Sequence, residues 1–178
     1  MKNIVYFDLE TKNSFDDVGG RNNMRALRVS IGVTYSSATG EYHIFDEHHV
    51  NDLIEELRRA DLVVGYNILG FDYEVLIGHN VLFDPSTLPS LDLMADLAVQ
   101  FKFRPSLDAV ANATLGVEKT SDGLQAIRWY REGKLLEIAE YCCYDVKLTR
   151  MIHEYGRYHG QLYVVDRNNV KRSAPVKW

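Results

Sequence analysis

Residues 1–13 of the chain read MKNIVYFDLETKN. The apolar run at residues 4–7 has no polar alternation, which is typical of a strand buried on both faces in the centre of an α/β sheet. Asp8 and Glu10 follow, and in a strand residues two apart point to the same side. Because their charges repel within one small volume, the sequence predicts that a positive group or a cation lies beside them.

The region after this strand predicts two further strands. Residues 12–26 are rich in Asn, Asp and Gly, so we expect an irregular loop there. Residues 27–35 alternate apolar and polar side chains with a period of two, residues 36–40 have the composition of a turn, and residues 41–47 return as a third strand. The first three strands therefore predict an antiparallel meander.

Helices and buried strands alternate in the rest of the chain. Asn51 is positioned to cap a short amphipathic helix, and residues 62–67 form another apolar run that predicts a buried strand. Further helical patterns lie at residues 72–79, 106–116 and 134–155, with Ser106 and Gly116 at the ends of the second. The expected fold class is α/β: a mixed sheet, with a meander of three strands plus parallel strands, covered by helices.

Composition limits the class of protein. The 178 residues are 46% hydrophobic, enough for one substantial core, so we expect a single domain over residues 1–178. Within it, residues 161–178 form a C-terminal extension whose pattern suits a closing hairpin. The formal net charge of −5 argues against a protein that coats nucleic acid by bulk charge alone.

The sequence also bears on location. No apolar segment has the character of a signal peptide or the length of a membrane span, so we expect no membrane partner. The only cysteines, Cys142 and Cys143, are neighbours, and this spacing suits neither a disulfide framework nor a zinc site. We therefore expect a cytoplasmic protein in which both cysteines serve helix packing.

Acids also follow the second buried strand and occupy the longest predicted helix. Asp72 begins a helix just after that strand, where free backbone N–H groups favour negative charge. Tyr141 and Asp145 are four residues apart and thus share one helix face. Asp8, Glu10, Asp72 and Asp145 can therefore meet at one edge of the sheet, where their pKa values would rise unless cations neutralised them.

Hard cations with oxygen ligands, Mg²⁺ or Mn²⁺, match four clustered carboxylates. Mg²⁺ usually takes only one or two carboxylates, so four of them suit two ions. Two such ions about 3.5–4 Å apart clamp the attacking and leaving oxygens of an in-line phosphoryl displacement. The acids thus predict a two-ion centre for phosphoryl chemistry.

Three motifs carry a resemblance to a known family. FDLET at residues 7–11, GYNILGFD at residues 65–72 and YCCYD at residues 141–145 resemble, in that order, the three exonuclease motifs of the DEDD superfamily of 3′-to-5′ exonucleases, which has the ribonuclease H-like fold. Tyrosine four residues before Asp145 resembles the y-type branch (DEDDy), which includes proofreading domains of family B DNA polymerases. The h-type branch has His five residues before that Asp, where this chain has Glu140.

This resemblance implies a metal-dependent 3′-to-5′ exonuclease that releases nucleoside 5′-monophosphates from the 3′ end of single-stranded DNA or RNA. The four metal ligands it implies are Asp8, Glu10, Asp72 and Asp145, with Asp8 shared between both ions. Tyr141, whose ordinary pKa is near 10, would orient the attacking water rather than deprotonate it. The substrate-binding residues it implies are Thr11, Asn67 and Phe71, the last by stacking on a base.

Simpler interpretations stay open for single residues. Asp72 could be only a helix cap, Tyr141 and Phe71 core aromatics, and Asn67 a turn residue. Asp92 suits a helix cap better than a metal ligand. For the whole chain, the alternatives are a catalytically silent nucleic-acid-binding module and a structure-selective endonuclease on the same fold. The sequence leaves open the choice of DNA or RNA, any protein partner and the oligomeric state.

Overall fold

The computed structural model describes residues 2–117, 123–166 and 168–178. Its main sheet has the strand order β3-β2-β1-β4-β5, made of β1 Ile4–Thr11, β2 Val29–Ser36, β3 Glu41–Asp46, β4 Leu62–Gly65 and β5 Ser90–Asp92. β1, β2 and β3 pair antiparallel, whereas β4 is parallel to β1 and β5 is parallel to β4. This mixed sheet confirms the expected fold class, including the meander of three strands. The short β5 was not expected, because three residues cannot display a period of two.

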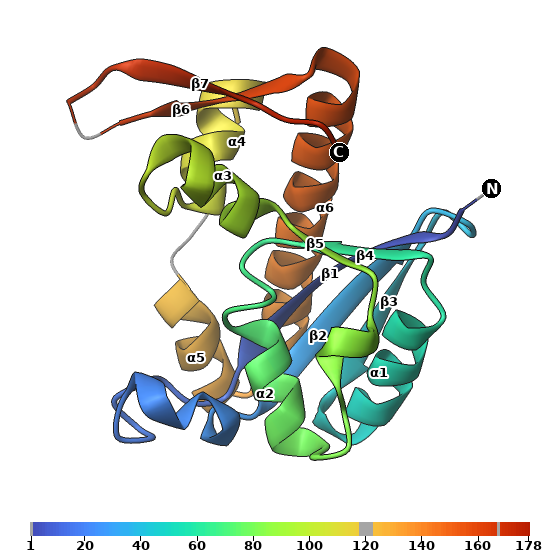
Figure 1. Cartoon of the computed structure of the whole chain (residues 1–178). Coiled ribbons are helices and arrows are strands. Elements are labelled where there is room, and N and C mark those ends of the chain that lie inside the picture. The colour runs from blue at the N-terminus through green and yellow to red at the C-terminus, as the bar shows by residue number, and fades with distance from the viewer. Residues whose placement is uncertain (1, 118–122, 167) are drawn as a thin grey trace.

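Helices cover both faces of this sheet (Figure 1). They are η1 Arg21–Ala26, η2 Glu47–His49, α1 Val50–Arg58, α2 Asp72–His79, η3 Pro85–Thr87, α3 Leu93–Phe101, α4 Leu107–Leu115, α5 Gly123–Arg131 and α6 Leu135–His159. One hydrophobic cluster joins the sheet to α1 and α2, and the other joins it to α3, α4, α5 and α6. The short helix η1 lies within residues 12–26, where the sequence predicted an irregular loop.

The central strand β1 contributes to both clusters. Val5, Phe7 and Leu9 pack with α1 and α2, and Tyr6 packs on the opposite face with α6. The prediction of a strand buried on both faces is therefore confirmed. By the same alternation, the acids at positions 8 and 10 emerge on the side of α6.

Helix caps explain where two of the helices begin. The Oγ of Ser106 accepts a hydrogen bond from the N–H of Ala109 (3.2 Å), and Gly116 ends α4 with φ 72°, as predicted. The prediction of Asn51 as the cap of α1 is wrong, because α1 begins at Val50. The carboxylate of Asp46 accepts hydrogen bonds from the two residues that follow Glu47, and the turn η2 that it caps runs directly into α1.

The last two strands, β6 Gln161–Val165 and β7 Lys171–Pro175, pair antiparallel in a separate sheet. They lie across α4 and the end of α6, at the top of Figure 1. Leu162, Val164 and Ala174 are buried there and extend the cluster of α3, α4 and α6. None of the helices in the described part of the chain is long and apolar enough to cross a membrane.

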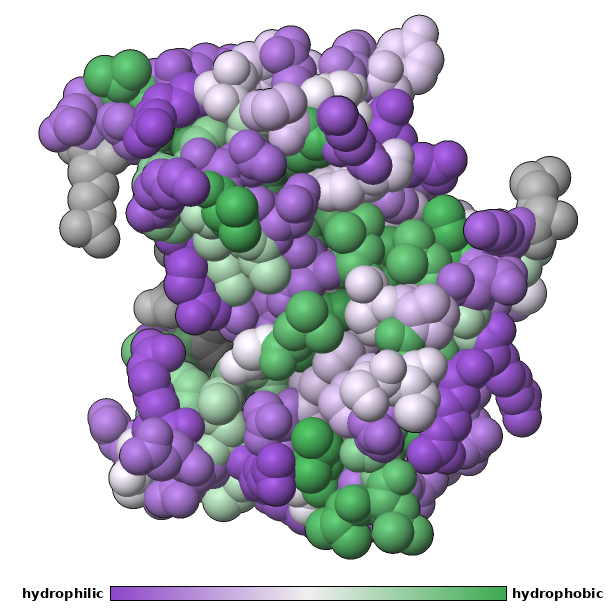
Figure 2. Space-filling model, viewed as in Figure 1, coloured by the Kyte–Doolittle hydropathy of each residue, from purple (hydrophilic) through white to green (hydrophobic). Residues whose placement is uncertain are grey.

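Hydrophilic and hydrophobic residues are interspersed on the surface in Figure 2. Hydrophobic residues gather at its lower edge, near the end of α2. The loop after α2 contains Val81 and Leu82, each 83% exposed.

Candidate active site

Three of the predicted acids form one cluster. Asp8 and Glu10 project from β1, and Asp145 projects from α6, which packs against β1 and β2. One carboxylate oxygen of each lies within 4.8 Å of those of the other two. Residues 135 positions apart in the chain therefore share one site.

Asp72 joins this site from the first turn of α2, after the strand β4. Its side chain is 2% exposed, and its Oδ1 accepts a hydrogen bond from the N–H of Leu9 at 3.2 Å. Leu9 is the residue between Asp8 and Glu10. The acids Asp8, Glu10 and Asp72 line one cavity. Asp72 thus lies beside the cluster, although its oxygens are not within the close group formed by Asp8, Glu10 and Asp145.

Burial raises the pKa values of all four acids, and the charge of at least one neighbouring acid adds to each shift: Asp92 for Asp72 and Asp108 for Asp145. Burial raises the pKa of Asp8 well above its ordinary value, and the charges of Asp72, Asp145 and Glu10 add to the shift. The pKa of Glu10 is raised by burial and by Asp145 and Asp72. Burial raises the pKa of Asp72 and that of Asp145 to about 7, in Asp72 against the opposing effect of backbone hydrogen bonds. Such a cluster favours any cation that neutralises it.

Tyr141 lies one turn before Asp145 on α6, as the spacing predicted. A hydrogen bond from its hydroxyl lowers the pKa of Asp145, against the larger effect of burial. Burial and then the charge of Asp145 raise the pKa of Tyr141 itself. Its ring packs edge-on against Trp129 of α5, with centroids 6.2 Å apart. The Tyr141 hydroxyl is therefore a neutral hydrogen-bond donor at the edge of the acid cluster.

Cys142 contacts Asp8 directly. The side chain is fully buried, and its Sγ lies 3.4 Å from both the Oδ2 and the backbone oxygen of Asp8. The predicted packing role is confirmed, and the thiol additionally donates to the Asp8 carboxylate. Sequence reasoning missed this contact, because it joins a strand residue and a helix residue that are 134 positions apart in the chain.

A cavity of about 370 Å³ opens beside the acids. Thr11, Asn67 and Phe71, the predicted substrate-binding residues, all line it. The hydroxyl of Thr11 donates to the backbone oxygen of Asn13 at 3.0 Å, and its oxygen keeps the chemistry of a hydrogen-bond acceptor. The cavity is therefore lined by acidic, polar and aromatic side chains together.

Apolar side chains also line this cavity, and sequence reasoning did not identify them. They are Phe15, Leu27, Leu124 and Ile127. Phe15 meets Phe71 edge-on, with ring centroids 6.0 Å apart. Phe15 is the only aromatic residue of the polar segment 12–26. A single aromatic side chain in a polar loop was the feature by which the sequence could have indicated this residue.

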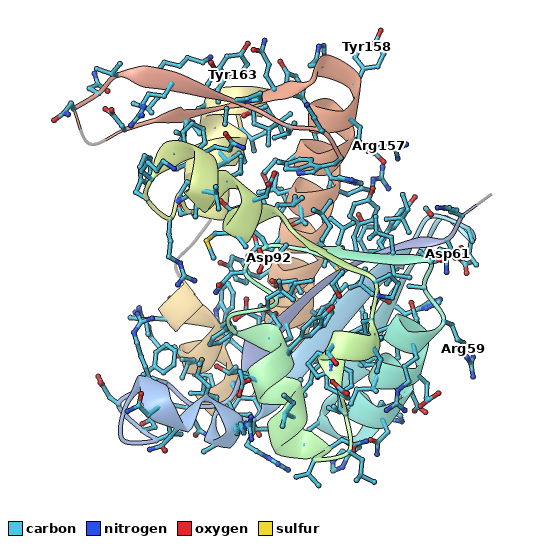
Figure 3. The ribbon with its side chains drawn as sticks, viewed as in Figure 1. Arg59, Asp61, Asp92, Arg157, Tyr158 and Tyr163 are labelled. Carbon is cyan, nitrogen blue, oxygen red and sulfur yellow. The ribbon has the colours of Figure 1, made fainter. Side chains whose placement is uncertain are left out.

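Asp92 caps α3, as predicted, by accepting the N–H of Ala95 at 3.1 Å. The same carboxylate accepts the N–H groups of Asn67 and Leu69 at 2.8 and 3.0 Å. Asn67 has a left-handed backbone, with φ 70°. Figure 3 shows Asp92 between α3 and the segment that leads into α2. This acid therefore fixes the loop that presents Asn67 to the cavity.

Comparisons with known proteins agree with this fold. A family model described as the RNase_H superfamily matches residues 5–157. The solved structure of the family B DNA polymerase from the hyperthermophilic archaeon Pyrobaculum calidifontis is similar, with a TM-score of 0.66 and 18% sequence identity over 88% of this chain. The chain spans only 24% of that polymerase chain, and this likeness concerns the fold. No curated protein sequence matches the chain.

Proposed function

This chain belongs to the RNase H superfamily, and on that premise we propose that it is a metal-dependent 3′-to-5′ exonuclease of the DEDDy type. It hydrolyses the last phosphodiester bond of single-stranded DNA or RNA and releases nucleoside 5′-monophosphates. The convergence of Asp8, Glu10 and Asp145 within 4.8 Å, with buried Asp72 beside them, carries the proposal. We further propose that residues 1–178 act as one exonuclease domain in the cytoplasm.

The donor set fits hard divalent cations. The close cluster found in the described residues consists of carboxylates alone, and oxygen ligands are those that Mg²⁺ and Mn²⁺ prefer. Asp8 interacts electrostatically with all three other acids, so we assign it to both ions, Glu10 and Asp145 to one and Asp72 to the second. When bound, the ions would supply positive charge for the reacting phosphate and would lower the pKa of a coordinated water.

The residues of the chain then orient the reactants. The oxygen of water forms a bond to the terminal phosphorus while the bond from phosphorus to the 3′ oxygen of the preceding nucleotide breaks. The attacking water gives a proton to solvent, and the leaving 3′ oxygen takes one up to become a hydroxyl. Tyr141 stays neutral because its pKa is raised, so its hydroxyl positions the attacking water and does not act as a base. The Cys142 thiol holds the Asp8 carboxylate in place.

The cavity beside the acids receives the terminal nucleotide. Phe71 and Phe15 offer aromatic faces and edges to the base, which suits any base sequence. The Asn67 amide and the Thr11 oxygen supply hydrogen-bonding groups to the sugar and phosphate. No base-specific contact is required by this arrangement.

Digestion of 5′-labelled single-stranded oligonucleotides tests the proposal. With Mg²⁺ or Mn²⁺, DNA or RNA should shorten stepwise from the 3′ end and give a ladder of labelled products, and excess chelator should stop the reaction. A circular single strand should resist, because it has no 3′ end. Cleavage of the circle would favour the endonuclease, and binding without any cleavage would favour the silent module.

A further inference from the structure

A second cavity, of about 860 Å³, lies at the opposite end of β1 from the acids. Ile4, the first residue of β1, lines this cavity, whereas Asp8 and Glu10 line the first one. At about 3.3 Å per residue of strand, Ile4 and Glu10 are roughly 20 Å apart. Within the described part of the chain no residue lines both cavities, so a small ligand in the second cavity lies away from the acids.

Three cationic side chains line the second cavity. They come from three separate segments: Lys2 before β1, Arg157 near the end of α6 and Lys177 after β7. All three are exposed, and the contacts of residues 2–117, 123–166 and 168–178 include no ion pair for any of them. The acid of this cavity, Asp61, lies on the same side of the molecule as Arg157 (Figure 3) and already accepts the N–H of Asn3 at 2.7 Å. The cavity therefore gathers positive charge that an anion can neutralise.

The imidazole of His153 lines the cavity although it is only 1% exposed. Its Nδ1 lies 2.9 Å from the hydroxyl oxygen of Tyr6, and among the described contacts its Nε2 has no hydrogen-bond partner. Burial, and then the charge of Arg157, lower the pKa of His153 to about 4, so the ring is neutral at pH 7. When the Tyr6 hydroxyl donates to Nδ1, Nε2 carries the proton and can donate to a ligand.

The indole of Trp178 lines the cavity beside these groups. Its Nε1 donates to the Oδ2 of Asp96 on α3 at 2.8 Å, and its ring centroid lies 5.7 Å from that of His153. Gly156 leaves room for the ring against α6, because a Cβ at Gly156 would lie 2.7 Å from the indole. The position of the indole is therefore fixed by contacts with α3 and α6.

Apolar side chains of the main sheet complete the lining. They are Ile4 of β1, Leu62 of β4 and Leu91 of β5, all half-buried. An indole and apolar side chains offer contacts for a base, whereas guanidinium and ammonium groups bind phosphate. The volume lies in the range of sites that bind small organic ligands. These features together suit a molecule that carries both a base and a phosphate.

We propose that the second cavity binds a free nucleoside monophosphate, with Arg157 and Lys177 on the phosphate and Trp178 against the base. This inference goes beyond the proposed exonuclease activity and does not require it, because none of the four clustered acids lines the cavity. A groove for a single strand carries its cations along the path of the backbone. Here the cations converge from three segments on one cavity with a single indole, which suits one nucleotide better than a strand.

Calorimetric titration in excess chelator tests this site. Without cations the acids of the first cavity repel a phosphate, so binding there is suppressed and no strand is cut. The ligands are adenosine 5′-monophosphate, adenosine, and a single strand of ten adenosines. Arg157→Gln and Lys177→Gln each remove one cation from the cavity. Lys147→Gln is the matched control, at an exposed position of α6 ten residues before Arg157 and about 15 Å away along the helix.

We expect the wild type and Lys147→Gln to bind adenosine 5′-monophosphate equally. Arg157→Gln and Lys177→Gln should bind it on the order of tenfold more weakly, because a hydrogen bond to a charged group contributes about that factor. Adenosine should bind weakly and to the same extent in all four proteins, since it has no phosphate. Absence of binding to the wild type, or equal binding of the monophosphate by all four proteins, would overturn the proposal. Binding of the strand without binding of the monophosphate would also overturn it and would assign the cations to nucleic acid.

Tryptophan fluorescence locates the base. Trp129→Phe leaves Trp178 as the only tryptophan of the chain. Saturating adenosine 5′-monophosphate should quench its emission, because the base stacks on the indole, whereas inorganic phosphate should not. Unchanged emission with the monophosphate calorimetrically bound would overturn the placement beside Trp178. None of these measurements depends on catalysis, so failure of the exonuclease function is distinguishable from failure of this site.

Discussion

Asp145→Asn should stabilise the metal-free protein, and increasingly so as the pH rises. Burial raises the pKa of Asp145 to about 7 from the ordinary 3.8, so the folded protein holds a proton that the unfolded chain has lost. Between these two pKa values the wild type loses stability with every increase in pH, because the folded state binds more protons. Asparagine has nearly the same shape and no charge, so it escapes this loss.

The size of the effect follows from the two pKa values. Linkage at about 1.4 kcal/mol per pH unit gives Asp145 a penalty of about 2 kcal/mol at pH 5 and about 4 kcal/mol at pH 8. The advantage of Asp145→Asn over wild type should therefore grow by about 2 kcal/mol between these pH values. For a chain of this size, that corresponds to roughly 4–8 °C in Tm.

Thermal and urea unfolding in excess chelator measure this difference at pH 5, 6, 7 and 8. Asp52→Asn, at an exposed position on α1, is the matched control and should follow the wild-type curve. Parallel curves for wild type and Asp145→Asn would refute the account, because they would mean that Asp145 itself binds no excess proton in the folded state. A decrease in the advantage with rising pH would refute it equally.

Three further predictions concern metal and chemistry. Mn²⁺ or Mg²⁺ at 100 times its dissociation constant should stabilise the wild type by about 2.7 kcal/mol. The resulting rise in Tm should shrink in Asp8→Ala and Asp145→Ala; equal rises in all three proteins would place the ions elsewhere. Asp8→Ala should abolish nuclease activity but keep the circular dichroism of a folded protein, and residual cleavage that chelator does not stop would contradict the metal dependence. Tyr141→Phe should lower the single-turnover rate on the order of 10²–10⁴-fold with little change in metal affinity, whereas Asp145→Asn should fall to background; full activity in Tyr141→Phe would reduce Tyr141 to a packing residue.

Local patterns explain why the centre of the fold was predictable. The apolar run before Asp8 and the alternation over residues 27–35 identify β1 and β2, because strand burial repeats every two residues. The same period places Asp8 and Glu10 on one side. Residues four apart share one face of a helix, so the spacing of Tyr141 and Asp145 places both on one side of α6. The contributions of β1 and α6 to the acid cluster could therefore be predicted.

Contacts between distant segments were not predictable in this way. Asp92 reads as a helix cap in the sequence, and its hydrogen bonds to the Asn67 loop depend on the pairing of β4 with β5. Because β5 has only three residues, no local pattern reveals that pairing. Arg104 and Cys142 acquire their contacts with Asn67 and Asp8 in the same manner, through packing of elements far apart in the chain.

The site lies where the sheet opens beside β1. β1 pairs with β4 only from Ile4 to Tyr6, whereas its pairing with β2 continues to Thr11. Beyond Tyr6 the β4 edge of β1 therefore needs other partners, and the Asp72 carboxylate supplies one by accepting the N–H of Leu9. Asp72 thus satisfies a backbone N–H at the unpaired edge of β1 and also lines the cavity. The other three acids lie close to one another, and the described contacts give none of their carboxylates a hydrogen bond from a backbone N–H. The pairing of β4 with β1 ends at Tyr6, and the cavity lined by Asp8, Glu10 and Asp72 lies beyond that point, beside the acids whose repulsion a bound cation would relieve.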